Sequence, residues 1–255
     1  MIRVGDGFGI SEAGKHNIRN LSERFDCNMI EWMPSIKWYR EIIRKQFEEL
    51  GNFPIVDQLI YTIPYNICAA MKIPLLIYGE DPPYEYGTSN TLTNATDYVA
   101  SMFRALVTKP FQGDRAVTVD FASHYVPWEG HSNYELAKLW GFKELEWNRK
   151  GTVENYDSLD LLGWGVSNWL KFIKYGYGRS TDILCRWIRA GLIDRDKALV
   201  MANIHDGELD PIILDDFLKF TGYSEKEFWE IVDKWVSKDL FTKENGKWIP
   251  RFELK

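Results

Sequence analysis

The segment richest in potential chemistry is residues 78–87, where glycine and acidic residues follow a short apolar run. Gly79 lets a ligand approach the backbone closely, because it has no side chain. Glu80, Asp81 and Glu85 bring three carboxylates to one place, where they could hold Mg²⁺ or orient an amine nucleophile. The alternative is an acidic surface loop stiffened by two prolines, and the residues alone do not decide between the two.

A second segment, residues 171–182, combines glycines, positive charges and a predicted helix start. Gly176 and Gly178 leave the backbone accessible, and Ser or Thr at 180–181 can cap the next helix, whose N-terminus favours an anion. Lys174 and Arg179 add positive charge, so the segment could hold a pyrophosphate or a sugar phosphate. A glycine that ends one helix before another begins explains the same residues, and local sequence alone favours this simpler interpretation.

The remaining motifs narrow the possible chemistry. The glycine cluster at residues 5–9 lacks dinucleotide-binding spacing, and no Lys-Ser/Thr pair follows it, so it is not a P-loop. No Gly-x-Ser-x-Gly nucleophile elbow is present. The four histidines have neither HExxH spacing nor a nearby cysteine pair, so we expect surface or core positions for them and no metal site. The best candidates for another role are His16, close behind the first strand end, and His124, which follows the strand-like residues 116–121.

Three predicted strands position these segments in the first half of the chain. They are residues 2–4, 29–32 and 74–78, the last a continuous apolar run typical of a strand covered on both faces. They alternate with helices, which predicts a parallel α/β sheet with its chemistry at the carboxyl ends of the strands. Because the first strand lies at the start of the chain, we expect earlier strands to belong to a segment that is not present.

Hydrophobic spacing also predicts the helices of this half. Ser11 caps a helix whose apolar face is Ile18, Leu21 and Phe25. A second helix covers residues 36–50, ended by a glycine, and a third covers 60–71, kinked or split at Pro64.

From residue 157 onward the sequence predicts helices. They are expected at residues 161–175, 180–190, 195–203 and 211–220, followed by a helix that Ser224 and Glu227 open with a capping box. Asn245-Gly246 is typical of a hairpin turn between 240–242 and 247–249. We therefore predict two domains, a partial α/β domain at 1–150 and a helical region at 151–255.

The composition excludes several classes of protein. With 45% hydrophobic and 27% charged residues in 255, the chain is long and apolar enough to bury a core. Its net charge is −6 and no basic, aromatic-rich run occurs, which argues against nucleic acid as a partner. The apolar runs are too short to span a membrane, the N-terminus is unlike a signal peptide, and three widely spaced cysteines argue against disulfides. We expect a cytoplasmic protein with Cys68 in its core.

These motifs, taken in order, resemble the N-acetyl sugar amidotransferase family, PP-loop enzymes of bacterial surface-polysaccharide, lipopolysaccharide and flagellar-glycan pathways. The similarity spans nearly the whole chain and rests on residues 11–21, 47–51, 73–87, 174–182, 188–195 and 206–207. It implies an α/β fold in which a parallel-sheet, adenine-nucleotide-hydrolase-like PP-loop domain, lacking its first strand and loop, precedes a mainly helical C-terminal region.

The chain departs from this family at its beginning. Such proteins are expected to open with a small cysteine-rich metal-binding segment and a Ser-Gly-Gly-x-Asp-Ser loop that cradles the phosphates of ATP, and neither is in this sequence. The resemblance therefore implies a split enzyme, a truncated gene product, or a relative that has lost catalysis.

The resemblance also implies a reaction, two cofactors and partners. ATP, with Mg²⁺, would activate the acetamido oxygen of a sugar or sugar nucleotide, and ammonia would then replace it to give an acetamidino group. A partner glutaminase would supply the ammonia, since nothing in this chain resembles a glutaminase. The alternative is a non-catalytic homologue that binds a sugar nucleotide or scaffolds the glutaminase. A third alternative is a PP-loop ligase that acts on another acceptor, such as a tRNA. The net negative charge of the chain argues against it, because nucleic acid is bound mainly by basic surfaces.

The family positions assign expected roles to individual residues. Those expected to lie near ATP are Gly5, Asp6, Gly7, Gly79, Lys174 and Arg179. Glu80 and Glu85 would face the reacting centre, and Tyr86 and Asp182 would contact the substrate. We expect the loops around Glu80 and Arg179 to converge on one cleft.

Overall fold

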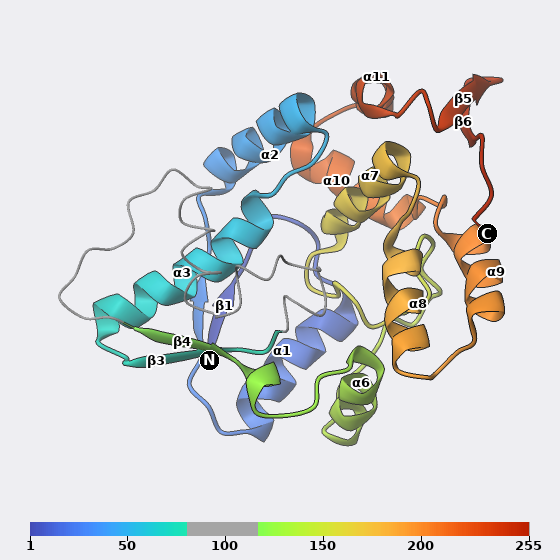
Figure 1. The fold of residues 1–255 in the computed structure, drawn as a ribbon. Helices are drawn as coiled ribbons and strands as arrows, with labels where there is room; N and C mark the ends of the chain where they lie inside the picture. Colours follow the sequence, from blue (N-terminus) through green and yellow to red (C-terminus); the bar gives the residue numbers. More distant parts are fainter. Residues whose placement is uncertain (81–116, 255) are drawn as a thin grey trace. The chain divides into compact units, whose positions relative to one another are not determined.

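The computed structural model describes residues 1–80 and 117–254, and Figure 1 shows its ribbon. The chain divides into two compact units whose segments alternate along the sequence. The first unit contains Met1–Asp6, Cys27–Ser35 and Pro54–Asn133, and the second contains Gly7–Asp26, Ile36–Phe53 and Tyr134–Lys255. The predicted domains 1–150 and 151–255 are consecutive stretches instead, and that assignment stays a prediction.

In the described part of the first unit, the main elements are two pairs of parallel strands and one long helix. β1 (Ile2–Val4) pairs with β2 (Ile30–Trp32), and β3 (Leu75–Tyr78) pairs with β4 (Thr118–Phe121). Along the chain, helix α3 (Ile55–Met71) lies between β2 and β3. The short 3₁₀ helix η1 (Ala122–His124) follows β4. The core of the unit is an apolar cluster of Tyr61, Cys68, Ala69, Leu76, Tyr78, Val117, Val119 and Phe121. The expected core position of Cys68 is thus confirmed.

Two expectations for this unit were wrong. Helix α3 begins at Ile55 rather than residue 60 and is not split at Pro64, whereas a kink at Pro64 stays a prediction. Strand β3 is not covered on both faces, because Leu75 and Ile77 are 49% and 52% exposed while Leu76 and Tyr78 are buried. An apolar run without alternation therefore did not identify a strand buried on both sides.

The second unit is mainly helical. Its first helices are α1 (Glu12–Arg24) and α2 (Ile36–Leu50), and the boundary between the units falls within α6 (Gly130–Leu139). The 3₁₀ helix η2 (Leu162–Trp164) precedes a series of longer helices. These are α7 (Gly165–Tyr175), α8 (Arg179–Arg189), α9 (Arg195–His205), α10 (Pro211–Thr221) and α11 (Glu225–Trp235).

Local signals placed most of these helix ends correctly. Helix α2 has the predicted bounds, and the capping box of Ser224 and Glu227 opens α11. The terminal hairpin joins β5 (Phe241–Glu244) to β6 (Lys247–Pro250) through Asn245 and Gly246, both at positive φ, as a two-residue turn of this type requires.

The apolar face predicted for α1 was wrong. Ser11 caps the helix by accepting a hydrogen bond from the Gly14 amide, as expected. However, the helix buries Ala13, Gly14 and Asn17, while Leu21 and Phe25 are 44% and 51% exposed.

Aromatic rings form the core of the second unit. Phe47, Phe53, Phe217 and Phe228 are fully buried, and their ring centroids lie 5.2 to 5.8 Å apart in the contacting pairs. Burying large rings is strongly stabilising, and edge or offset contacts between them add to it. Much of the high aromatic content therefore serves this core.

The described strands form three two-stranded sheets, two parallel and one antiparallel, beside a larger number of helices. This is an α/β arrangement with small sheets, and its relation to a PP-loop domain stays a prediction. In the part of the chain that the structure describes, no helix is both long and apolar enough to cross a membrane.

Candidate functional site

A hydrogen-bonded acid, histidine and tyrosine lie at the carboxyl end of the β3–β4 pair. His124 Nδ1 lies 2.5 Å from Asp120 Oδ1, and the Tyr125 hydroxyl donates to the other carboxylate oxygen. The Phe121 amide also donates to Asp120, at 2.9 Å. Parallel register pairs Ile77 with Asp120, so Gly79 and Glu80 leave the sheet at the same edge as this trio.

The surrounding hydrogen bonds fix the charge of this trio. The hydroxyl of Tyr125, then the Phe121 amide, lower the pKa of Asp120, and the carboxylate in turn raises the pKa of the tyrosine. The Asp120 side chain is 24% exposed and the His124 side chain 40%. A fixed carboxylate therefore holds a histidine that solvent can reach.

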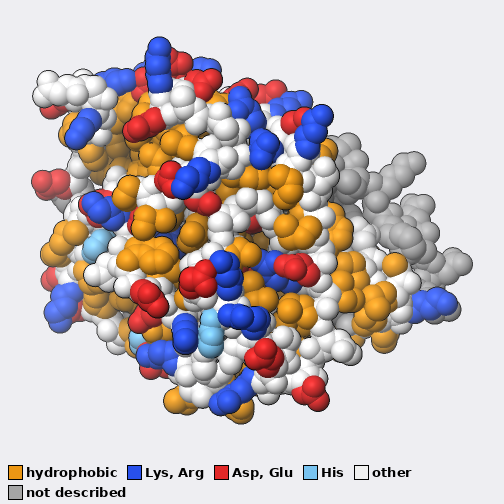
Figure 2. Space-filling model, turned by 180° about the vertical axis from the view of Figure 1, so that it is seen from behind, with side chains coloured by type: hydrophobic (Ala, Val, Ile, Leu, Met, Phe, Trp, Pro, Cys, Tyr) orange, Lys and Arg blue, Asp and Glu red, His pale blue; other side chains and the backbone are white. Residues whose placement is uncertain are grey.

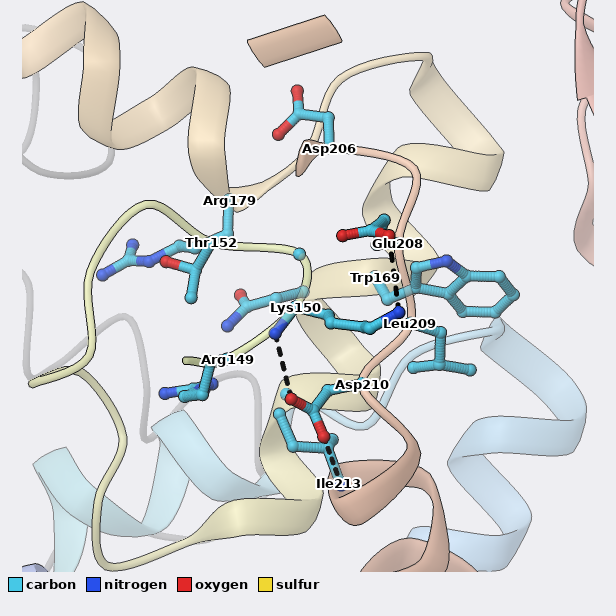
Figure 3. Close-up of a pocket in the computed structure, with 13 residues that line it drawn as sticks. Arg149, Lys150, Thr152, Trp169, Arg179, Asp206, Glu208, Leu209, Asp210 and Ile213 are labelled. Carbon is cyan, nitrogen blue, oxygen red and sulfur yellow. Dashed lines mark hydrogen bonds and ion pairs between the residues drawn. The ribbon is translucent and has the colours of Figure 1, made fainter. Parts of the chain in front are cut away.

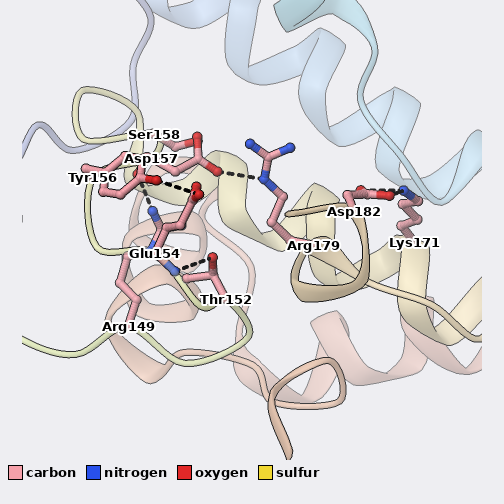
Figure 4. Close-up of polar contacts among 9 residues, drawn as sticks. All are labelled: Arg149, Thr152, Glu154, Tyr156, Asp157, Ser158, Lys171, Arg179 and Asp182. Atoms are coloured by element: carbon pink, nitrogen blue, oxygen red, sulfur yellow. Dashed lines mark hydrogen bonds and ion pairs between the residues drawn. The ribbon is translucent and has the colours of Figure 1, made fainter. Parts of the chain in front are cut away.

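In the second unit, Arg149 and Arg179 both bind Asp157, Arg179 at its carboxylate and Arg149 at its backbone oxygen (Figure 4). Arg179 Nε donates to Asp157 Oδ2 at 2.7 Å, and each of these side chains is 20% exposed. Arg149 is 7% exposed and donates through Nη1 to the backbone oxygen of Asp157. Burial alone would raise the pKa of Asp157, but Arg179 and Arg149 together lower it to about 2.

Beside this network is a pocket bounded by the start of α7, the start of α8 and the loop before α10 (Figure 3). Its central hollow is small, about 20 Å³, which is enough for one water molecule. The polar and aromatic groups on its wall are Arg149, Lys150, Thr152, Asn168, Trp169, Arg179, Asp206, Glu208 and Asp210. Lys150 Nζ lies 3.6 Å from Glu208, and the Trp169 indole donates to the Gly207 oxygen.

Two buried aspartates on the pocket wall bind backbone N–H groups. Asp206 accepts from the amides of Gly178 and Thr181 and from the Thr181 hydroxyl. Asp210 caps α10 and also accepts from the Lys150 amide at 3.0 Å. The expected cap at residues 180–181 was therefore wrong, because a carboxylate from far along the chain binds the N-terminus of α8 instead.

Several predicted site residues are bound within the second unit. Lys174 donates to the Leu50 oxygen and lies over the Trp235 ring, whereas Arg179 points to Asp157. Asp182 is held by Lys171 at 2.6 Å, on the side of α8 away from the Asp157 contact (Figure 4). Their roles toward phosphate and substrate stay predictions.

In the glycine cluster near the N-terminus, close packing explains why Gly5 and Gly7 are glycines. The Gly5 amide donates to the Trp32 oxygen, and a side-chain carbon at Gly5 would lie 2.0 Å from the Met33 sulfur. A side-chain carbon at Gly7 would lie 2.0 Å from the Phe220 ring. Packing alone accounts for these two glycines, and the expected positions of Gly5, Asp6 and Gly7 near ATP stay predictions.

The remaining predictions concern the acidic segment. Glu80 is half-buried just beyond β3, and a side-chain carbon added at Gly79 would lie 3.8 Å from the Trp128 ring. Glu85 and Tyr86 lie outside the described residues. Within residues 1–80 and 117–254, no group of three metal-ligating side chains is assembled. Glu80 and Arg179 belong to different units, so their convergence on one cleft stays a prediction.

Sequence reasoning missed the residues with the densest contacts. Arg149 and Asp157 lie in a stretch without regular periodicity, so only the concentration of charge near residues 149–157 pointed to them. Asp120 was part of a predicted strand whose neighbouring histidine, His124, had been noted. Asp206 is followed by Gly207 in one of the motifs shared with the family, and this pair was the only local sign that Asp206 has a special role.

Comparison with known proteins connects the second half of the chain with surface polysaccharide synthesis. Residues 150–253 match the family described as LPS biosynthesis protein WbpG-like, C-terminal domain. This range includes Lys174, Arg179, Asp182 and the pocket residues other than Arg149. The match supports an LPS biosynthesis family for this region. No curated protein matches the sequence.

Proposed function

We propose that this protein takes part in an ATP-dependent amidotransferase reaction of lipopolysaccharide biosynthesis, in which a sugar N-acetyl group becomes an acetamidino group. The match to an LPS biosynthesis domain over residues 150–253 supports the pathway. The family-like motifs in the first half support the reaction. The observation that carries the proposal is that the matched domain has Trp169, Lys150 and Arg179 on the wall of one pocket.

The chemistry of these three side chains suits a sugar nucleotide. Arginine and lysine are the usual partners of phosphate oxygens, and an indole ring offers a flat apolar face to a sugar. On the face seen in Figure 2, acidic and basic side chains are intermingled, so charge alone does not mark the ligand. Because the hollow holds only about one water molecule, we assign to Trp169, Lys150 and Arg179 contacts with a sugar nucleotide that lies across the mouth of the pocket and does not enter it.

The proposed reaction runs in two steps. The acetamido oxygen attacks the α-phosphorus of ATP, and the bond to pyrophosphate breaks, leaving an O-adenylated imidate. Ammonia, supplied by a glutaminase partner, then adds to the imidate carbon, and AMP leaves with the former acetamido oxygen. Glu80 and Glu85, which the family resemblance assigns to the reacting centre, would orient ammonia or hold Mg²⁺, which would supply Lewis-acid stabilisation of the departing phosphate.

Purified protein incubated with ATP, Mg²⁺, ammonium chloride and an N-acetylated sugar nucleotide tests this proposal. The expected products are AMP, pyrophosphate and a sugar in which an N–H group has replaced an oxygen, identified by mass spectrometry. Parallel reactions receive a separate polypeptide carrying the Ser-Gly-Gly-x-Asp-Ser loop. Failure to form AMP and amidine in both series contradicts the proposed activity.

A second candidate is a sugar-nucleotide-binding protein without catalysis. The observation that favours it is the internal pairing of the pocket charges, with Asp206 already bound to the start of α8. Calorimetric titration separates the candidates, because this one predicts sugar-nucleotide binding without ATP consumption. In either case Trp169→Leu should weaken binding, whereas Trp38→Leu, an exposed tryptophan on α2, should not.

A further inference from the structure

The trio at the end of β4 has the geometry of an oriented general base. Asp120 Oδ1 lies 2.5 Å from Nδ1 of His124, so the natural donor is the Nδ1–H group of the neutral ring. A proton held on Nδ1 leaves Nε2 as the acceptor nitrogen. The histidine side chain is 40% exposed, and among the described residues its only hydrogen bond is through Nδ1.

The carboxylate itself is held firmly. Besides His124, it accepts from the Phe121 amide at 2.9 Å and from the Tyr125 hydroxyl. These two donors fix the plane of the carboxylate and lower its pKa, so it stays ionised while it orients the ring. Phe121, whose ring meets the imidazole edge at a centroid distance of 5.8 Å, limits the motion of the ring further.

The trio also lies at the carboxyl ends of two parallel strands, where functional sites of such sheets are found. The register of β3 and β4 pairs Tyr78 with Phe121, so Gly79 and Glu80 leave β3 beside the residues that leave β4. Ligands of open parallel sheets bind at this edge. A surface ion pair made only for stability needs neither a third donor nor a strand-end position.

We propose that His124 is a catalytic base that removes a proton from the attacking amine, with Asp120 as its positioning residue. This inference rests on the proposed function and names the proton acceptor for its second step. The ammonia lone pair forms the new C–N bond, and the surplus N–H proton passes to Nε2 of His124. The C–O bond then breaks, its electron pair leaves with AMP, and His124 returns its proton to water.

The activity test uses the split between the two half-reactions. His124→Gln should slow amidine formation by about 10² to 10⁴, the usual range for loss of a general base. Sugar-dependent exchange of pyrophosphate into ATP should be unchanged, because it reports the first step alone and shows that the variant is folded. His131→Gln, a histidine change in the same unit, should alter neither rate.

Two further measurements distinguish a base from a structural histidine. Added imidazole should restore amidine formation to His124→Ala, which a purely structural role would not allow. Nitrogen-15 correlation spectra of the neutral ring should show Nδ1 protonated in the wild type, and this preference should be lost in Asp120→Ala. An unprotonated Nδ1 in the wild type, or equal amidine formation by His124→Gln, overturns the assignment. A wild type that forms no amidine removes the proposed function, and this inference with it.

Discussion

Replacing Asp157 by asparagine should destabilise the protein by an amount that the structure allows us to work out. The carboxylate is 20% exposed and its pKa falls from 3.8 to about 2 on folding. That difference corresponds to about 2 kcal/mol of stability, at 1.36 kcal/mol for each pKa unit. The amide also leaves Arg149, which is 7% exposed, beside a neutral group, so the loss should be at least this large.

The pH dependence gives the prediction its sign. Because the pKa of Asp157 is lower in the folded protein, its contribution is present above pH 3.8 and is lost as the pH falls toward 2. Urea unfolding should therefore show a nearly constant deficit for Asp157→Asn between pH 7 and 5 and a shrinking one below pH 4.

Asp182→Asn is the matched control for this experiment. Its partner Lys171 is 29% exposed and Asp182 itself 27%, so that solvent-accessible pair should contribute less than about 1 kcal/mol. A change at Asp157 below about 0.5 kcal/mol, the size of an ordinary surface substitution, would refute the reasoning about the arginine network.

Three other predictions concern stability. Burial raises the pKa of Asp57 from 3.8 to about 6, so stability should fall as the pH rises from 4 to 6. In urea unfolding, Asp57→Asn should gain about 3 kcal/mol at pH 7 but nothing at pH 3. Gly7→Ala should lose about 1 to 3 kcal/mol in thermal unfolding, because the added methyl group overlaps the Phe220 ring. Ser224→Ala should cost about 1 kcal/mol through loss of the α11 capping box, and an unchanged melting temperature would contradict this.

The sequence predicted those parts of the fold that local rules determine. Helix α2 follows from apolar residues at three- and four-residue spacing that end at a glycine, and the structure buries Tyr39, Ile43 and Phe47 as that spacing requires. The hairpin follows from Asn245-Gly246, a pair that accepts positive φ.

The failures came from contacts between distant residues. Asn17 bonds both backbone groups of Lys143, which turns the small residues of α1 inward and leaves Leu21 and Phe25 exposed. Asp206 binds the start of α8 from 28 positions away along the chain. No local pattern encodes such partners, because side-chain periodicity reports which face is apolar and not what covers it.

The candidate site was predictable only in outline. His124 stood out because it follows a strand-like segment, but its contact with the carboxylate of Asp120 became apparent only from the folded chain. Arg179 was predicted from its charge beside glycines, whereas the opposing carboxylate of Asp157 became apparent only from the folded chain.

Oxygen-isotope transfer tests the proposed reaction most directly. An N-acetylated sugar nucleotide carrying ¹⁸O in its acetamido group is incubated with the protein, ATP, Mg²⁺ and ammonium chloride, and the AMP is analysed by mass spectrometry. Activation of the acetamido oxygen predicts one ¹⁸O atom in each AMP formed with an amidine. Amidine formed together with unlabelled AMP would contradict the account.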